Sequence, residues 1–111
     1  MSKIHMLDKN TPSFVSKSGN LFVAFLDGEA ISSIEEFYTA VAKALHFPDY
    51  FGRNMDALEE MLNDLEWIKE ESFLLIIKNA DDLLKGKSGE KAKIIDLIQL
   101  VDNPRFEICF V

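Results

Sequence analysis

Acidic side chains are concentrated in one short stretch, and their carboxylates are the groups in this sequence best placed to do chemistry. Residues 49–71 carry eight acids and two bases, so this segment holds −6 of the formal net charge of −7. Asp56 and Glu60 are four residues apart, a spacing that places them one above the other on a helix. Such a pair could hold a divalent cation, face a cationic partner, or form a solvated helix surface.

The elements around these acids can be read from local signals. Asn54 is a good N-cap for a helix. An apolar stripe then follows at helical spacing, so the carboxylates lie on the opposite face with Glu59 and Asn63 beside them. The stripe consists of Leu58, Met61, Leu62 and Leu65. Before the helix, Tyr50 and Phe51 could present flat apolar surface next to the acids. We expect Phe51 to pack inward, because it has no hydroxyl to keep in water.

Other kinds of site are poorly supported. His5 and His46 have no ligands at metal-binding spacing, and Cys109 is the single cysteine. There is no Ser-His-Asp order, glycine-rich phosphate loop or HExxH motif. A hydrolase using Asp56 and Glu60 to bind Mg²⁺ remains an alternative, although only Arg53 is close enough to meet a phosphate substrate. We therefore predict no enzyme, no cofactor and no metal.

Length and composition favour one soluble α/β domain. The 111 residues are 48% hydrophobic, and the longest apolar run, 21–26, is too short to span a membrane. The negative charge opposes direct binding of nucleic acid. The single cysteine and the lack of an apolar signal core at the N-terminus favour the cytoplasm. We expect residues 1–20 to be an irregular lead-in, with a short strand at 13–16, and residues 21–111 to form the domain. The free protein is expected to be a monomer.

Hydrophobic patterning predicts the order of the elements. Continuous apolar runs predict strands buried on both faces, and capping signals with apolar residues at helical spacing predict helices. The strands are expected at 21–26, 73–77 and 106–111, and the helices at 34–45, 54–65, 80–85 and 90–101. Helices between strands favour parallel pairing with right-handed crossovers. The expected fold is a three-stranded parallel sheet packed with about four helices.

The segment 48–58, PDYFGRNMDAL, closely resembles the signature of the barstar family, intracellular inhibitors of the ribonuclease barnase. The stretch 26–29, followed by 31–33, resembles the family's first strand and the entry to its first helix. The stretches 65–67 and 77–81 resemble the longer barstar-like proteins of bacteria, so the likeness covers about residues 21–111. The resemblance implies a small layered α/β fold. It also implies binding to a basic ribonuclease or ribonuclease-like toxin, in whose active site the acids would replace RNA phosphates.

The resemblance also assigns roles to individual residues. Asp56 and Glu60 would be the phosphate mimics, Tyr50 would lie on the partner, Gly52 would allow close approach and Asn54 would cap the helix. The full predicted binding set is Tyr50, Gly52, Asn54, Met55, Asp56, Glu59, Glu60, Asn63 and Asp64.

Three positions depart from barstar itself. In barstar the position of Glu59 is tryptophan, and that of Glu60 is usually the shorter aspartate. The acid late in barstar's last long helix is replaced by Leu100, with Asp102 a weak substitute. These departures count against barnase as the partner and leave another basic nuclease or toxin. A regulatory module that binds some other basic protein through the same acidic face is the alternative function.

Overall fold

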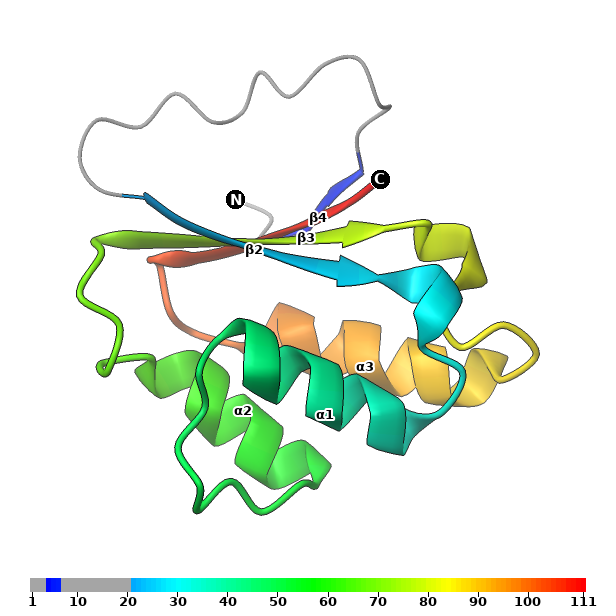
Figure 1. The fold of residues 1–111 in the computed structure, drawn as a ribbon, viewed down its shortest axis with the longest axis horizontal. Coiled ribbons are helices and arrows are strands. Elements are labelled where there is room, and N and C mark those ends of the chain that lie inside the picture. Colours follow the sequence, from blue (N-terminus) through cyan, green and yellow to red (C-terminus); the bar gives the residue numbers. More distant parts are fainter. Residues whose placement is uncertain (1–3, 7–20) are drawn as a thin grey trace.

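A parallel sheet covered by helices on one face is the framework of the computed structural model, which describes residues 4–6 and 21–111 (Figure 1). The strands are β1 (Ile4–Met6), β2 (Leu21–Asp27), β3 (Ser72–Lys78) and β4 (Phe106–Phe110). The helices are α1 (Ile34–Ala44), α2 (Met55–Asp64) and α3 (Ser88–Leu100), with 3-10 turns η1 (Gly28–Ala30) and η2 (Ala80–Asp82). The strand order is β1-β4-β3-β2, and each adjacent pair is parallel.

The predicted α/β fold is confirmed, with differences in two elements. The three expected strands form, and β1 adds a fourth by pairing Ile4 with Ile108 and Met6 with Phe110. This strand lies within the stretch expected to be irregular, whereas the strand expected at 13–16 falls outside the described residues. The helix expected at 80–85 is only the turn η2. Asn79 before it and Leu84 after it both take left-handed backbone conformations, which end helical geometry on either side.

The core lies between the sheet and the helices. β3 is central in the sheet, and Phe73, Leu75 and Ile77 on it are almost completely buried. For β2 the prediction of burial on both faces was wrong. β2 is an edge strand in which Ala24 and Leu26 are buried while Val23 and Phe25 alternate with them and are exposed. An unbroken apolar run does not reveal whether a strand has one neighbour or two.

The entry into α1 is fixed by the expected capping signals. Ser33 is the N-cap, and its Oγ accepts a hydrogen bond from the Glu36 backbone N–H at 3.1 Å. The Glu36 carboxylate reaches back to Ser32, accepting from its backbone N–H and its hydroxyl at 2.8 Å each. These bonds to Ser32 hold the pKa of Glu36 below its ordinary value. Two orphan donors near the helix start are thereby satisfied.

At the carboxyl end of β2 the chain passes very close to its neighbour. A Cβ on Gly28 would lie 2.4 Å from the Asn79 carbonyl oxygen and 3.0 Å from that of Lys78. Only glycine therefore fits where η1 turns across the end of β3. The same junction is tied by Asn79 Nδ2, which donates to Asp27 Oδ1 at 2.9 Å.

Candidate functional site

The start of α2 is set by a local cap, as predicted. Asn54 has extended backbone, and its Oδ1 accepts from the Ala57 backbone N–H at 2.8 Å. Its Nδ2 donates to the Gly52 carbonyl oxygen at 3.3 Å, which ties the loop to the helix. The helix ends where Leu65 takes a left-handed conformation. Because Leu58, Met61 and Leu62 are buried, the opposite face of α2 points into solvent.

That opposite face carries a row of carboxylates. Asp56, Glu60 and Asp64 are exposed, and Glu59 is half-buried. Within residues 4–6 and 21–111, no lysine, arginine or histidine lies within ion-pair distance of Asp56, Glu59 or Glu60. Repulsion among stacked like charges raises the free energy of the isolated helix by a few tenths of a kcal/mol per pair. A cationic partner would relieve this repulsion.

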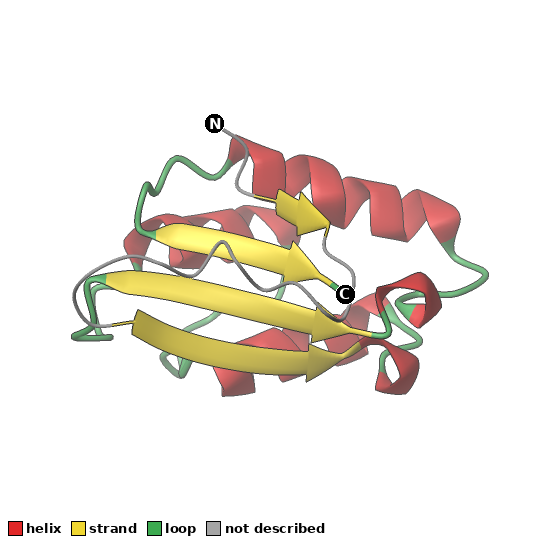
Figure 2. Cartoon of the chain, turned by 90° about the horizontal axis from the view of Figure 1, so that it is seen from above, coloured by secondary structure: helices red, strands yellow, loops and turns green. Residues whose placement is uncertain are grey.

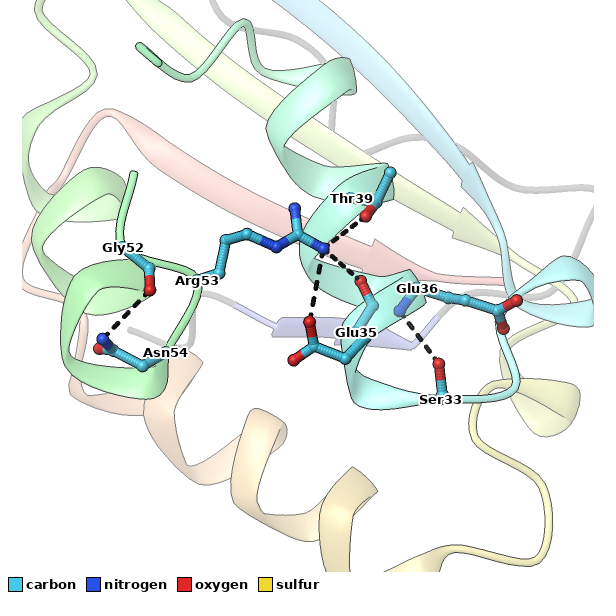
Figure 3. A network of polar contacts seen from close by, with 7 residues as sticks. All are labelled: Ser33, Glu35, Glu36, Thr39, Gly52, Arg53 and Asn54. Carbon is cyan, nitrogen blue, oxygen red and sulfur yellow. Dashed lines mark hydrogen bonds and ion pairs between the residues drawn. The ribbon is translucent and has the colours of Figure 1, made fainter. Parts of the chain in front are cut away.

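Arg53, the nearest base in sequence, is turned away from these acids. Its Nη2 donates to Thr39 Oγ1 at 2.7 Å and to the Glu35 carbonyl oxygen at 3.1 Å, and lies 3.6 Å from Glu35 Oε1 (Figure 3). Arg53 itself has a left-handed backbone, with φ of 53°, which turns the chain between the loop and α2. The guanidinium thus anchors the loop to α1 and does not neutralise the acids of α2.

The loop between α1 and α2 rests on packed aromatic rings. Phe51 is buried, with its ring centroid 4.9 Å from that of Phe47 and 5.9 Å from that of Tyr38, both edge-on. Phe47 in turn meets Trp67, whose Nε1–H donates to the Leu45 carbonyl oxygen at 2.9 Å. The expectation that Phe51 packs inward is confirmed. This packing fixes the loop against the core.

Next to this buried ring, Tyr50 projects from the loop. Its exposed fraction is 73%, the largest among the exposed large apolar side chains of the described residues. A tyrosine ring provides a large contact area with few rotatable bonds, so it is a favourable residue for an interface. The structure therefore places an aromatic surface just before the carboxylates of α2.

Gly52 is not demanded by the fold. Its backbone is not left-handed, and a Cβ would come no closer than 3.4 Å to any atom, the nearest being Ala57 Cβ and Asn54 Nδ2. Alanine could therefore occupy this position at little steric cost. The residue is exposed, so the missing side chain leaves the backbone open from outside the molecule.

At the far end of α2, tertiary contacts bring in residues that lie far away in the sequence. Asn63 Oδ1 accepts from the Asp102 backbone N–H at 2.7 Å, and the buried Asn103 donates through Nδ2 to the Leu62 carbonyl oxygen at 3.0 Å. Asp102 thus joins the acidic end of α2, and Asn63 acts by positioning it. Leu100, 69% exposed, lies just before this turn at the end of α3. In the sequence, Leu100 lies off the apolar stripe of its helix, and this position is the signal that indicates an exposed side chain.

The remaining predicted residue, Met55, is half-buried and packs against the core, so only part of its side chain is available to a partner.

In the described residues, no three or more His, Cys, Asp or Glu side chains gather as a metal site. No helix among those residues has the length and apolar character needed to cross a bilayer.

Comparison with known proteins confirms the likeness over most of the sequence. Residues 21–107 match the protein family described as Barstar (barnase inhibitor). The chain belongs to this family. A relative in Bacillus subtilis (strain 168), named "Putative ribonuclease inhibitor YrdF", is 37% identical over 87 residues, which cover 68% of this chain and 92% of the relative. The family match contains β2 to α3 and includes the whole acidic face of α2 with its loop.

Proposed function

We propose that this protein inhibits a basic ribonuclease or ribonuclease-like toxin by covering its active site with α2 and the preceding loop. The observation that carries the proposal is the row of carboxylates on α2 that have no ion-pair partner among the described residues, next to the exposed ring of Tyr50. Membership in the Barstar (barnase inhibitor) family supports the same function. In this proposal the protein is not an enzyme, because it binds in the catalytic site of another protein instead of forming one.

The acids act as substitutes for RNA phosphates. A ribonuclease cleft presents cations to its substrate, and Asp56 and Glu60 are spaced to meet two of them along one helix face. A carboxylate about 4 Å from a cation gains about 1 kcal/mol in water and about 4 kcal/mol at an effective dielectric near 20. Each carboxylate therefore contributes more once the cleft excludes water. Long-range attraction also raises the association rate, which falls as salt is added.

The other residues of the set shape the contact. Tyr50 lies flat on the surface of the nuclease, and Gly52 lets the backbone approach it closely. Glu59, Asp64 and Asn63 form the rim, with Asp102 held beside Asn63. Glutamates at positions 59 and 60 favour a nuclease whose cleft is deep and strongly basic, and we propose one other than barnase. A chain whose single cysteine, Cys109, is buried fits action in the reducing cytoplasm.

The test is inhibition of purified basic ribonucleases on a fluorogenic RNA substrate, with barnase as one of the probes. We expect stoichiometric inhibition of at least one enzyme, and its loss in the double variant Asp56→Ala/Glu60→Ala. In parallel, both proteins serve as bait in an extract of the source cell. A ribonuclease retained only by the wild type supports the proposal. Retention of a basic protein without nuclease activity supports the regulatory module instead, and RNA cleavage by this chain alone would refute inhibition.

A further inference from the structure

The outer edge of β2 lacks the features that normally prevent strands from pairing between molecules. β2 pairs with β3 on one side, and Figure 2 shows it as the outermost strand of the sheet, with no described strand beyond it. Its register with β3 is continuous over seven residues, so no bulge interrupts it. Residues 21–26 contain no charge and no proline. Exposed edges are ordinarily guarded by lysine, proline or a bulge.

Beside this edge the structure has an open groove between β2 and α1. Its volume is about 640 Å³. Leu26 and Ile31 line it on one side, and Thr39, Ala40 and Ala44 line it on the side of α1. The small side chains in the middle of α1 would let another helix approach closely. Next to the groove, Phe25 is 58% exposed and Val23 is 40% exposed, although both belong to a strand.

The two ends of the groove have opposite charge. Asp27, Glu35 and Glu36 line the end where β2 finishes and α1 begins. Arg53 lies 3.6 Å from Glu35, whereas Asp27 and Glu36 have no ion pair among the described residues. Lys43 lines the other end of the groove. That end lies near the start of β2, because the ring of Phe22 on β2 is 5.8 Å from the ring of His46, which follows α1. Among the described residues Lys43 has no ion-pair partner. If a second copy of the chain is related by a 180° rotation about an axis at the outer edge of β2, the acidic end of each groove lies beside the Lys43 end of the other.

We propose that this edge is the interface of a symmetric dimer, with a second copy of this chain as the occupant. A two-fold axis perpendicular to the sheet pairs β2 with β2 of the copy in antiparallel fashion and joins the two sheets. If the pairing is centred on Ala24, Val23 of each copy lies opposite Phe25 of the other on the exposed face. The symmetry therefore forms the same apolar contact twice. The two α1 helices then lie antiparallel on the same side, with Lys43 facing the acidic end of the other groove.

A second copy fits better than an unrelated strand because each feature of this surface is complementary to itself. The apolar pair on β2, the small residues on α1 and the opposite charges all match under the same rotation. In this proposal the free protein is a dimer, in place of the monomer expected from the sequence. The proposal does not depend on the nuclease, because the acids of α2 are not part of this interface.

The test is sedimentation equilibrium of the full chain over a range of concentrations. We expect a monomer–dimer equilibrium that Phe25→Lys weakens about a hundredfold, since the symmetry presents Phe25 twice. The matched control is Leu100→Lys, an equally apolar-to-charged change at a side chain 69% exposed on α3, which leaves the dimer intact. Melting by circular dichroism checks that both variants fold. Hydrogen exchange should show β2 amides gaining protection as concentration rises.

Charge gives an independent check of the orientation. Lys43→Glu places acids at both ends of the groove, so we expect weaker dimerisation that added salt partly restores. A wild-type protein that stays monomeric up to about 0.5 mM overturns the proposal, because such an interface would then be too weak to matter. A dimer that survives Phe25→Lys shows that it forms elsewhere and also overturns it. Dimerisation unchanged by Lys43→Glu contradicts the two-fold arrangement.

Discussion

Replacing Glu60 by glutamine separates the function of the acidic face from its stability. The substitution keeps the shape of the side chain and removes one charge. In the structure Glu60 is exposed and has no ion pair in the described part of the chain, so the folded protein loses no contact. We expect Glu60→Gln to weaken inhibition and, at the same time, to raise thermal stability.

The stability gain follows from the spacing on α2. Glu60 lies four residues from Asp56 and four from Asp64, so two like-charged pairs are relieved. Each such pair costs about 0.2–0.5 kcal/mol in a helix. In a domain of about 100 residues a gain of this size raises the melting temperature by about 2–4 °C.

The loss of binding is larger, because the nuclease cation facing Glu60 would be buried without a partner. Removing one member of a buried ion pair costs about 3 kcal/mol. That corresponds to about a hundredfold rise in the dissociation constant. The rise should come mainly from faster dissociation, since one charge of many changes long-range attraction only slightly.

The assay measures the inhibition constant against a ribonuclease that the wild type inhibits, with melting curves recorded on the same samples. Glu66→Gln is the matched control: it removes the same charge from an exposed glutamate beyond the end of α2. Both variants therefore have the same net charge, and the control should lose little affinity and gain no stability. Equal losses of affinity in both would show that only overall charge matters, and would refute a specific place for Glu60. A lower melting temperature for Glu60→Gln would show that its carboxylate is already used within the fold.

Three further substitutions test the roles of single residues. Gly52→Ala should leave the free energy of unfolding within about 1 kcal/mol of the wild type by urea titration, because its Cβ fits, while weakening inhibition by blocking close approach. Gly28→Ala should destabilise by about 1–3 kcal/mol in the same titration, because its Cβ would meet the Asn79 carbonyl at 2.4 Å; an unchanged midpoint would contradict that contact. Hydrogen bonds lower the pKa of Glu36 in the folded state. The Glu36 carboxylate therefore stabilises the fold at pH values above its ordinary pKa of 4.5, and this stabilisation is lost as the pH falls through the lowered folded-state pKa. Ser32→Ala removes the hydroxyl's bond, so the melting temperature should decline less steeply with acid; parallel pH profiles would refute this origin.

The acidic face and the buried face of α2 have separate requirements. Its buried side needs only apolar residues at helical spacing, and that requirement leaves the exposed side free to collect charge. The cost of repulsion is small for each pair, so the fold tolerates a row of carboxylates that would be useful to a partner. The packed rings below the loop and the anchor from Arg53 to α1 then hold this row in place before binding.

Features that depend on near neighbours could be predicted from the amino-acid sequence. The cap at Asn54, the buried stripe of α2 and the capping of α1 all arise from groups a few residues apart, whose geometry is fixed by the helix or turn they form. The inward packing of Phe51 followed from the chemistry of its side chain, which has no hydroxyl to keep in water. For the same reason the spacing of the carboxylates was enough to place them on one face of a helix.

The tertiary structure alone decided which distant groups meet. Arg53 could form an ion pair with Asp56, three residues later, or with Glu35 on α1. The packing of the loop against α1 directs its guanidinium to Glu35. Asp102 joins α2 through Asn63, 39 residues earlier, and Ile4 pairs with Ile108 at the opposite edge of the sheet from β2. Strand order also decided that β2 is an edge with Phe25 exposed. Such contacts depend on how the chain crosses from strand to strand, and the pattern of residues within a segment does not encode which segment will lie beside it.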